Sequence, residues 1–522
     1  MNLRHRIGLV YLPGALPCFE DFGNLPTDLV CSDAFIDGKP ASEILDMIII
    51  PGGSLVESQS INKKVAQEIM KMADSGKFVL GICSGFQILA KETDVGRLST
   101  IPITKEGLGL LDAEFKPLIC TDRVNATITD KSFITEEVGK EVSGFHCHTY
   151  GKIILHKDSK TILVSHAKRL NYHADPQDLV SGVANKEGNV VGVFIHALLD
   201  QNPTIIQGIT KSLNINEVEL EAVRSANAKL LERIKCEVGI STNIHQQGTV
   251  NQKTSRLLLV TATASGSGKT FLATGIAGAL KKRGFKVGVL KVGGDIRDVV
   301  PALYLIKEPI KGYSSIKIGE SGWKPLAEAV REASQDHDFL LVEGAMGAFT
   351  GLLNDKFKRP TSTVEVAAAL GASTIIVISC DTEGLEGGLI NALSYINLLR
   401  SLGVKTTGVI LNKVGPSNLS DETKLTMKRA FENIGVELLG IVPRMDVEGR
   451  GMIPEIEIKY EEFGAQAIEV AEQYINLDVL TRIADAPKIK QVDHGAFMEK
   501  FKKLLTNLKL NASEGGKTQN CS

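Results

Sequence analysis

The feature that most constrains the fold is an alternation of short apolar runs with longer amphipathic stretches. In the first half of the chain the runs are "RIGLVYL", "LDMIIIPGG", "KFVLGIC" and "NVVGVFIHA". Stretches between them, such as "NKKVAQEIMKMADSG", predict helices that end at glycine. Strands that are apolar along their length and separated by helices favour a parallel sheet covered on both faces. The first half therefore predicts a doubly wound α/β domain.

The same alternation restarts after a polar stretch. Residues 236–255, "CEVGISTNIHQQGTVNQKTS", are the predicted linker. Six more runs follow: "RLLLVTA", "FKVGVLKVGG", "DFLLVEGAMG", "STIIVISCD", "KTTGVILNKV" and "VELLGIVPR". A chain of 522 residues is also too long for one ordinary core. The predicted class is therefore α/β with two doubly wound domains, at residues 1–235 and 256–480, followed by a Lys-rich helical tail at residues 481–522.

Composition excludes some partners and suggests a compartment. Lys and Arg number 59 against 61 Asp and Glu, so no overall basic excess points to nucleic acid or to an anionic membrane. No 18 apolar residues run together, as a membrane-spanning helix requires. The eight cysteines are scattered without a CxxC pair, which fits a reducing compartment better than a disulfide framework. We expect a cytoplasmic protein without a nucleic-acid or membrane partner.

A phosphate-binding loop is predicted in the second domain. "TATASGSGKT", Thr261 to Thr270, follows an apolar run and precedes a helical stretch, which is the context that a P-loop needs. Thr263 stands where the usual motif has its first glycine. Lys269 would reach the terminal phosphates of a nucleotide, and the Thr270 hydroxyl would bind Mg²⁺. The backbone N–H groups that would wrap the phosphates belong to Ser265, Gly266, Ser267 and Gly268.

Two further turns carry charges at the ends of apolar runs. Glu343 ends the run of "FLLVEGAMGAFTG", and "LKVGGDIRD" carries Lys291, Asp295 and Asp298. Because ligands of doubly wound sheets bind at the carboxyl ends of the strands, we expect these charges to converge. The predicted roles are metal binding for Glu343 and Asp295, phosphate binding for Lys291, and substrate contact for Asp298.

The second domain resembles the ATP-binding domain of the cobyrinic acid a,c-diamide synthase and cobyric acid synthase family, which is related to dethiobiotin synthetase. "KVGGDIRD", "EGAMGAFTG" and "GVILNKV" resemble that family's motifs, and "STVEVAAALGASTIIVIS" lies between the last two. The resemblance covers about residues 256–454 and departs at Gly294, Ile296, Arg297 and Thr350. It implies ATP and Mg²⁺ as cofactors.

Cys83 in "GICSGFQIL" is the candidate nucleophile of the first domain. A Gly-x-Cys-x-Gly segment between a strand and a helix predicts a nucleophile elbow with Cys in place of Ser. We expect the following helix to lower the pKa of the thiol through its dipole. His196, at the end of the last apolar run, is the candidate base. The predicted oxyanion-hole residues are Gly52, Gly53 and Ser84.

These residues resemble a class I glutamine amidotransferase domain over about residues 7–210. The resemblance implies that Cys83 attacks the side-chain amide of glutamine and releases ammonia. "EGLGLLD" resembles a stretch of the cobyric acid synthase type, and "SGFHCHTYG" aligns His148 as a glutamine-site residue. Many class I members have Glu two residues after the histidine, where this chain has Leu198; the cobalamin branch often works with a Cys–His pair. Asp200 is expected to be a solvated acid at a helix start.

The two resemblances together imply an ATP-dependent amidoligase that uses glutamine as amide donor. Its acceptor would be the peripheral carboxylates of a corrinoid or related tetrapyrrole, activated as acyl phosphates. The family usually places the ATP domain first, so the order here is reversed. A homodimer is one oligomeric state that the resemblance allows. Two alternatives remain open: a dethiobiotin synthetase-like ligase with a degenerate regulatory first domain, and a partner-binding ATPase switch like ParA and MinD. The deviant P-loop of those switches carries an extra Lys, which residues 261–267 lack.

Overall fold

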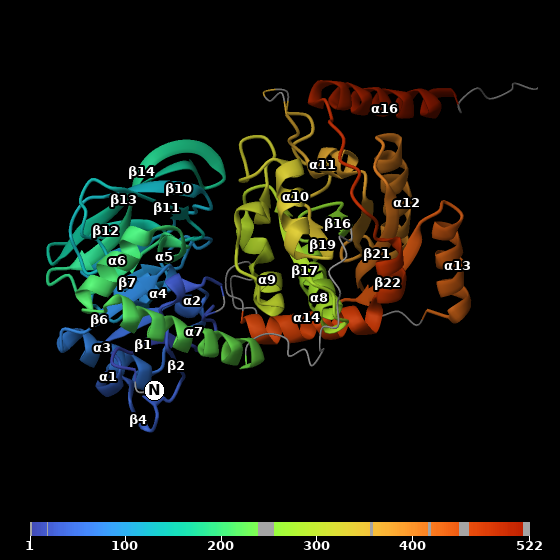
Figure 1. The fold of residues 1–522 in the computed structure, drawn as a ribbon. Helices are drawn as coiled ribbons and strands as arrows, with labels where there is room; N and C mark the ends of the chain where they lie inside the picture. Colours follow the sequence, from blue (N-terminus) through green and yellow to red (C-terminus); the bar gives the residue numbers. More distant parts are fainter. Residues whose placement is uncertain are drawn as a thin grey trace, which may run out of the picture. The chain divides into compact units, whose positions relative to one another are not determined.

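The computed structural model describes residues 3–17, 19–237, 255–354, 356, 359–415, 419–447 and 459–514, without the side chains of 235–237 and 507–514. Most of the predicted linker and the end of the predicted tail lie outside these residues. The chain divides into two compact units (Figure 1). Unit 1 contains Met1–Ser241, Leu303–Ile310 and Val447–Gly464, and unit 2 contains Thr242–Ala302, Lys311–Asp446 and Ala465–Ser522.

Unit 1 is built on a nine-stranded sheet with the order β11-β10-β13-β14-β15-β6-β5-β1-β2. The strands from β15 to β2 are parallel and contain all four predicted apolar runs. Strands β10, β11, β13 and β14 form an antiparallel half that the sequence analysis did not predict. The strands are β1 Ile7–Val10, β2 Asp28–Val30, β5 Met47–Ile50, β6 Phe78–Ile82, β10 Arg123–Ile128, β11 Glu141–Phe145, β13 Ser159–Leu170, β14 His173–Asn185 and β15 Val190–Val193.

Two smaller sheets and several helices also belong to unit 1. The small sheets have the orders β12-β9-β7-β8 and β3-β4. Their strands are β3 Phe35–Ile36, β4 Lys39–Pro40, β7 Glu92–Asp94, β8 Thr104–Glu106, β9 Ala113–Lys116 and β12 Lys152–Leu155. The helices are α1 Ala41–Ile44, α2 Leu55–Ser58, α3 Lys63–Asp74, α4 Ser84–Leu89, α5 Leu198–Gln201, α6 Pro203–Ser212 and α7 Glu217–Glu237.

Unit 2 is built on a seven-stranded parallel sheet with the order β18-β17-β19-β16-β20-β21-β22 (Figure 1). Six of these strands coincide with the six predicted apolar runs. The predicted class, α/β with doubly wound sheets, is confirmed. The strands are β16 Arg256–Ala262, β17 Val287–Val292, β18 Ser315–Ile316, β19 Phe339–Glu343, β20 Ser373–Ser379, β21 Thr406–Val414 and β22 Glu437–Pro443.

Strand register brings the predicted site of unit 2 to one edge of its sheet. Glu343, the last residue of β19, lies in register with Lys291 of β17 and with Val260 of β16. The P-loop follows β16, so it begins at the same carboxyl edge. The helices after residue 255 are α8 Lys269–Lys282, α9 Val300–Ile306, α10 Leu326–Asp336, α11 Thr363–Leu370, α12 Gly384–Ser401, α13 Asp421–Glu432, α14 Tyr460–Tyr474, α15 Leu477–Ile483 and α16 His494–Glu514. None of the described helices is long and apolar enough to cross a membrane.

Candidate functional sites

Cys83 lies on a sharp turn between β6 and α4. Its φ of +53° and ψ of −110° place this non-glycine residue in a strained conformation, as in a nucleophile elbow. The turn is tight: a Cβ added at Gly81 would lie 2.5 Å from the Gly85 oxygen, and one at Gly85 would lie 2.1 Å from the Ile50 oxygen. Only glycine fits at these two positions, because the added atom would meet backbone rather than a movable side chain.

Gly52, directly after β5, lies between Cys83 and His196. A Cβ added at Gly52 would lie 3.4 Å from the Cys83 Cβ, 2.8 Å from the His196 Cε1 and 3.7 Å from its Nε2. The Nε2 edge of the imidazole and the base of the thiol side chain therefore face the same small space. Gly53 has a φ of +144°, and a Cβ there would lie 2.0 Å from the Gly14 oxygen. The two predicted oxyanion-hole glycines thus pack without room for any side chain.

His196 follows β15 and is almost fully buried. Its backbone pairs with Phe145 through two hydrogen bonds, of 2.8 and 3.2 Å. The Phe145 ring stacks on the imidazole with centroids 5.2 Å apart, and the Phe19 ring meets it edge-on at 5.3 Å. The His196 Nδ1 lies 2.5 Å from the Glu20 Oε1. Packing on two sides and a polar contact on the far nitrogen leave the ring one orientation.

Burial raises the pKa of the Cys83 thiol well above its ordinary range, and nearby Cys147 and Glu57 raise it further. The prediction that the start of the following helix lowers this pKa is therefore wrong, because desolvation outweighs the favourable contact with the Ser84 backbone N–H. The thiol donates a hydrogen bond to the Cys147 carbonyl oxygen at 3.5 Å. Cys83 rests as a thiol and needs a base to become a nucleophile.

His148 belongs to a buried pair of histidines beside this thiol. Its Nε2 lies 3.0 Å from the His146 Nδ1, its Nδ1 lies 3.2 Å from the Leu118 oxygen, and the His146 Nε2 lies 2.7 Å from the Ser165 hydroxyl. Burial lowers the pKa of His146 well below its ordinary value, so that ring is neutral. His148 thus contacts His146 and the Leu118 carbonyl oxygen, and its predicted role with glutamine stays a prediction.

Asp200 lies in the first turn of α5 and is exposed, as expected, but its carboxylate has a function in the fold. It accepts hydrogen bonds from the backbone N–H groups of Gly23 at 2.7 Å and of Asp21 at 3.2 Å. Desolvation and the charge of Glu20 raise the pKa of Asp200 to about 6. Asp200 therefore holds the loop that carries Glu20 and is not itself a contact of His196.

The P-loop of unit 2 bends at two glycines with positive φ, Gly266 at +75° and Gly268 at +88°. The Asn412 side chain, from β21, donates to the Ser267 carbonyl oxygen at 2.8 Å and lies 2.3 Å from the place of a Cβ on Gly268. Asn412 is the asparagine of "GVILNKV", so this motif fixes the shape of the phosphate loop. Lys269 begins α8 and is buried; desolvation and Lys291 lower the pKa of its ammonium group.

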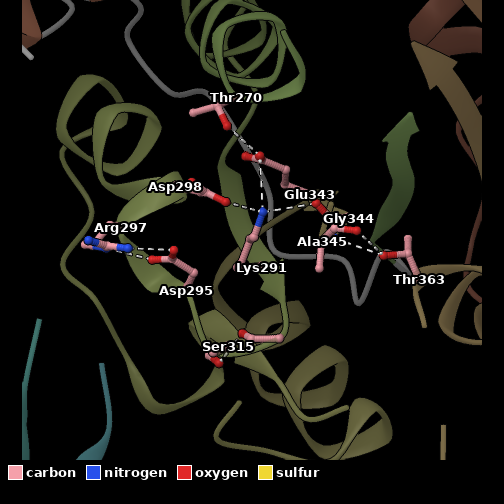
Figure 2. A network of polar contacts seen from close by, with 12 residues as sticks. Thr270, Lys291, Asp295, Arg297, Asp298, Ser315, Glu343, Gly344, Ala345 and Thr363 are labelled. Atoms are coloured by element: carbon pink, nitrogen blue, oxygen red, sulfur yellow. Dashed lines mark hydrogen bonds and ion pairs between the residues drawn. The ribbon is translucent and has the colours of Figure 1, made fainter. Parts of the chain in front are cut away.

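Thr270, Glu343, Lys291 and Asp298 form one polar network at the edge of the sheet (Figure 2). The Thr270 hydroxyl donates to Glu343 at 2.7 Å. The Lys291 Nζ lies 3.3 Å from the same Glu343 oxygen, 2.5 Å from Asp298 and 3.0 Å from the Gly344 oxygen. Burial alone would lower the pKa of Lys291, but Asp298 and Glu343 outweigh it and raise the pKa. Lys291 is thus a charged ammonium held between two carboxylates.

Asp295 lies apart from this group. Its carboxylate makes two hydrogen bonds of 2.8 Å with the Arg297 guanidinium (Figure 2). Although burial works against ionisation, Arg297 and Lys291 lower the pKa of Asp295. The structure therefore brings Asp298, rather than Asp295, to Glu343 and Lys291.

The residues fit a magnesium ion. The hydroxyl of Thr270 and the carboxylate of Glu343 are oxygen donors in contact with each other, and Asp298 is the next carboxylate, joined through Lys291. Mg²⁺ binds to such oxygens while keeping waters and substrate phosphates as its other ligands. Burial raises the pKa of Glu343, a cost that a cation beside the carboxylate would offset.

The loop after Glu343 is tied to the C-terminal segment by His494. This buried histidine contacts two acceptors: its Nδ1 lies 2.6 Å from a Glu365 oxygen and its Nε2 lies 3.0 Å from the Asn354 carbonyl oxygen. Each ring nitrogen must donate, which requires the doubly protonated imidazolium. Although burial opposes the charge, Glu365 and the carbonyl raise the pKa of His494. The predicted tail therefore begins with an ordered anchor.

We expect His494→Gln to destabilise the loop and α11 by about 1–3 kcal/mol at pH 6, because it leaves Glu365 and the Asn354 carbonyl without a cation. The folded pKa of His494 lies above the unfolded value of about 6.5. Its stabilisation is therefore complete below about pH 6.5 and is lost as pH rises through the folded pKa. Hydrogen exchange of the amides around Ser362 at pH 6 and pH 9 measures this. His173→Gln, at an exposed site, is the control; a pH-independent difference for His494→Gln would contradict the charged form.

Sequence reasoning missed three residues of these sites, namely Glu20, Asn412 and His494. Asn412 lies inside a motif that was noted only for its likeness to the family. Glu20 and His494 are 176 and 129 residues away from the partners that define them, His196 and Glu365. Neither has a local pattern that could have found it.

Comparison with known proteins supports both halves. Residues 6–204 match the family model of the CobB/CobQ-like glutamine amidotransferase domain. Residues 258–450 match that of the CobQ/CobB/MinD/ParA nucleotide binding domain. The resemblance inferred from the motifs is confirmed.

Three curated relatives are similar to parts of the chain. A hydrogenobyrinate a,c-diamide synthase of Mycobacterium tuberculosis is 35% identical over 188 residues, which are 35% of this chain and 39% of the relative. A cobyrinate a,c-diamide synthase of Streptococcus sanguinis is 28% identical over 44% of this chain and 50% of its own length. A cobyric acid synthase of Dehalococcoides mccartyi is 29% identical over 37% and 38%. The chain matches half or less of the length of each. Residues 6–204 are thus similar to the CobB/CobQ-like glutamine amidotransferase domain, and residues 258–450, which follow them, are similar to the CobQ/CobB/MinD/ParA nucleotide binding domain.

Proposed function

We propose that the protein is a glutamine-hydrolysing, ATP-dependent amidoligase that converts peripheral carboxylates of a corrinoid or related tetrapyrrole into amides. One observation carries the proposal: a single chain joins a Cys83–Gly52–His196 constellation to a P-loop whose threonine touches a strand-end glutamate. The relatives that match parts of it are named hydrogenobyrinate a,c-diamide synthase, cobyrinate a,c-diamide synthase and cobyric acid synthase. Each half explains why the other is needed, because ammonia and an activated carboxylate are the two reactants of amide formation.

In the first half-reaction His196 takes the thiol proton, and the Cys83 sulfur attacks the side-chain amide carbon of glutamine. Backbone N–H groups at Gly53 and Ser84 are the candidate donors to the resulting oxyanion. The C–N bond then breaks, the amide nitrogen takes the proton from His196, and ammonia leaves. Water hydrolyses the thioester to glutamate, again with His196 as base, and restores the free thiol.

In the second half-reaction a substrate carboxylate attacks the γ-phosphorus of ATP, giving an acyl phosphate and ADP. Ammonia attacks the acyl carbon, the bond from that carbon to the phosphate oxygen breaks, inorganic phosphate leaves with the electron pair, and the nitrogen releases a proton to give the amide. Lys269 would balance the charge of the terminal phosphates, and the P-loop amides would hold them in line. Mg²⁺, held by Thr270 and Glu343, would supply charge neutralisation on the phosphate oxygens. Asp298 is the candidate for contact with the acceptor, and Lys291 is a candidate for contact with the phosphates.

The test is incubation of the protein with MgATP, amide-¹⁵N glutamine and a panel of tetrapyrrole acids that includes hydrogenobyrinate and cobyrinate. Mass spectrometry counts each exchange of OH for ¹⁵NH₂. Labelled amide together with equal amounts of ADP and glutamate supports the proposal. Glutamine hydrolysis without exchange on any acid would reject the acceptor class, and ATP turnover that ignores glutamine would favour a ligase or switch with an inactive first domain.

A further inference from the structure

A buried carboxylate contacts the candidate base on the side away from the thiol. Glu20 is 4% exposed and His196 is 2% exposed. The Glu20 Oε1 lies 2.5 Å from the His196 Nδ1, and its Oε2 accepts a hydrogen bond of 2.7 Å from the Ala197 backbone N–H. One oxygen of Glu20 therefore contacts the His196 ring, and the other contacts the backbone of the next residue, Ala197.

This acid comes from an unexpected part of the chain. Position 198, two residues after the histidine, is a fully buried leucine and cannot supply a carboxylate. Glu20 belongs instead to the loop between β1 and β2, 176 residues before its partner. A buried carboxylate is costly unless it is paired, so its place here needs a partner such as a histidine that becomes charged.

The loop that carries Glu20 is fixed on both sides. Phe19 packs edge-on against the imidazole, and the backbone N–H groups of Asp21 and Gly23 donate to Asp200. Ala197, whose backbone N–H donates to the second oxygen of Glu20, has a φ of +56°, a strained value for a residue with a Cβ. The contact with Glu20 thus also holds the backbone turn that aims the histidine.

The chemical consequence concerns the two ring nitrogens. A carboxylate at Nδ1 keeps the proton there, so the lone pair of the neutral ring lies on Nε2. The Nε2 edge is the one that shares the space at Gly52 with Cys83. When the ring takes the thiol proton, the carboxylate balances the new positive charge. Because burial keeps Cys83 as a thiol, this assistance is needed for every turnover.

We propose that Glu20 is the positioning acid of a Cys83–His196–Glu20 triad, with the acid supplied from the loop after the first strand. The inference rests on the proposed glutaminase function and adds a third residue to it. Glu20 acts through His196 and does not itself touch glutamine.

The test compares Glu20→Gln, Glu20→Asp and Asp21→Asn. Asp21 is the neighbouring exposed acid, so Asp21→Asn removes a charge from the same loop without touching the histidine. We expect Glu20→Gln to lower the glutaminase kcat on the order of 10³–10⁴-fold, as loss of the acid does in serine triads. The KM for glutamine should change less than about threefold, and Asp21→Asn should keep kcat within about twofold. Glu20→Asp should recover at least about tenfold over Glu20→Gln.

Two measurements keep the outcomes separate. In ¹⁵N-histidine-labelled protein, the downfield Nδ1-bound proton of His196 should be lost in Glu20→Gln, and this readout requires no activity. Ammonia-dependent amidation should remain, which shows that the variant is folded. A kcat within threefold of wild type in Glu20→Gln, in a protein whose glutaminase depends on Cys83, would overturn the triad alone. If glutamine hydrolysis survives in Cys83→Ala, the proposed function fails instead. An unchanged signal of the His196 Nδ1-bound proton in Glu20→Gln would overturn the contact between Glu20 and His196.

Discussion

Cys83→Ala is expected to abolish glutamine-dependent amidation, by about 10³-fold or more, while amidation with ammonium salts continues near the wild-type rate. The Cys83 thiol is the proposed nucleophile that forms a covalent bond with the amide carbon. Its removal leaves the P-loop unit intact. The measurement is amide formation with glutamine and with ammonium chloride at a pH of about 8.5, where more of the ammonium is free ammonia.

The matched control is Cys147→Ser. Cys147 lies beside Cys83, its carbonyl oxygen accepts the Cys83 thiol, and its own side chain is only partly buried. A general effect of losing a thiol in this region would lower glutamine-dependent amidation in both variants. If Cys83 is the nucleophile, amidation by Cys147→Ser should stay within about threefold of wild type. Equal losses in the two variants would contradict the assignment of Cys83.

The same thiol should show a distinct pH dependence in the absence of glutamine. Because burial raises the pKa of Cys83 above its ordinary range, the reactive thiolate is scarce near pH 7. Alkylation of Cys83 by iodoacetamide, followed by mass spectrometry, should therefore be slower than for a free cysteine at pH 7 and should rise up to the highest pH at which the fold survives. The resting enzyme would thus be protected from oxidation until glutamine brings its amide into the site.

The parallel strands of the fold could be predicted from the sequence. Ten apolar runs coincide with ten parallel strands of the two large sheets, because strands buried on both faces show their burial directly in the sequence. The antiparallel half of unit 1 was missed for the opposite reason. In β10 exposed and buried residues alternate, and β14 begins with six exposed residues, so neither forms a continuous apolar run. Both are held in the sheet by antiparallel pairing with neighbouring strands, which an apolar run does not reveal.

The sites show the same limit. Glycines and phosphate-binding residues follow one another along the chain, so Cys83, Lys269 and Thr270 were found from local spacing. Charge partners are selected by proximity in the fold. Asp298 rather than Asp295 pairs with Lys291, because the Asp295 carboxylate is paired with the Arg297 guanidinium. A spacing rule cannot distinguish these two acids, since both lie on the same turn after β17.

Lys269→Met is expected to give the opposite result from Cys83→Ala. Removing the side-chain ammonium group of Lys269 should lower ATP-dependent amidation about 10²–10³-fold, whether glutamine or an ammonium salt supplies the ammonia. The reason is that this group balances the charge of the transferring phosphate at the start of α8. Glutamine hydrolysis measured alone should persist. In the nucleotide-free protein the substitution removes a repulsion: desolvation and Lys291 already lower the pKa of Lys269. The variant should therefore fold at least as well as wild type.

Lys281→Met is the control for Lys269→Met, because it removes a lysine from the last turn of the same helix, away from the P-loop. Fluorescent ADP binding and single-turnover amidation with ammonia measure both variants. Lys281→Met should stay within about twofold of wild type in each assay. If Lys269→Met still forms amide within tenfold of the wild-type rate, the P-loop is not the site of phosphoryl transfer. If it loses glutaminase activity together with amidation, the two half-reactions are coupled more tightly than separate sites imply, and the glutaminase would then require bound nucleotide.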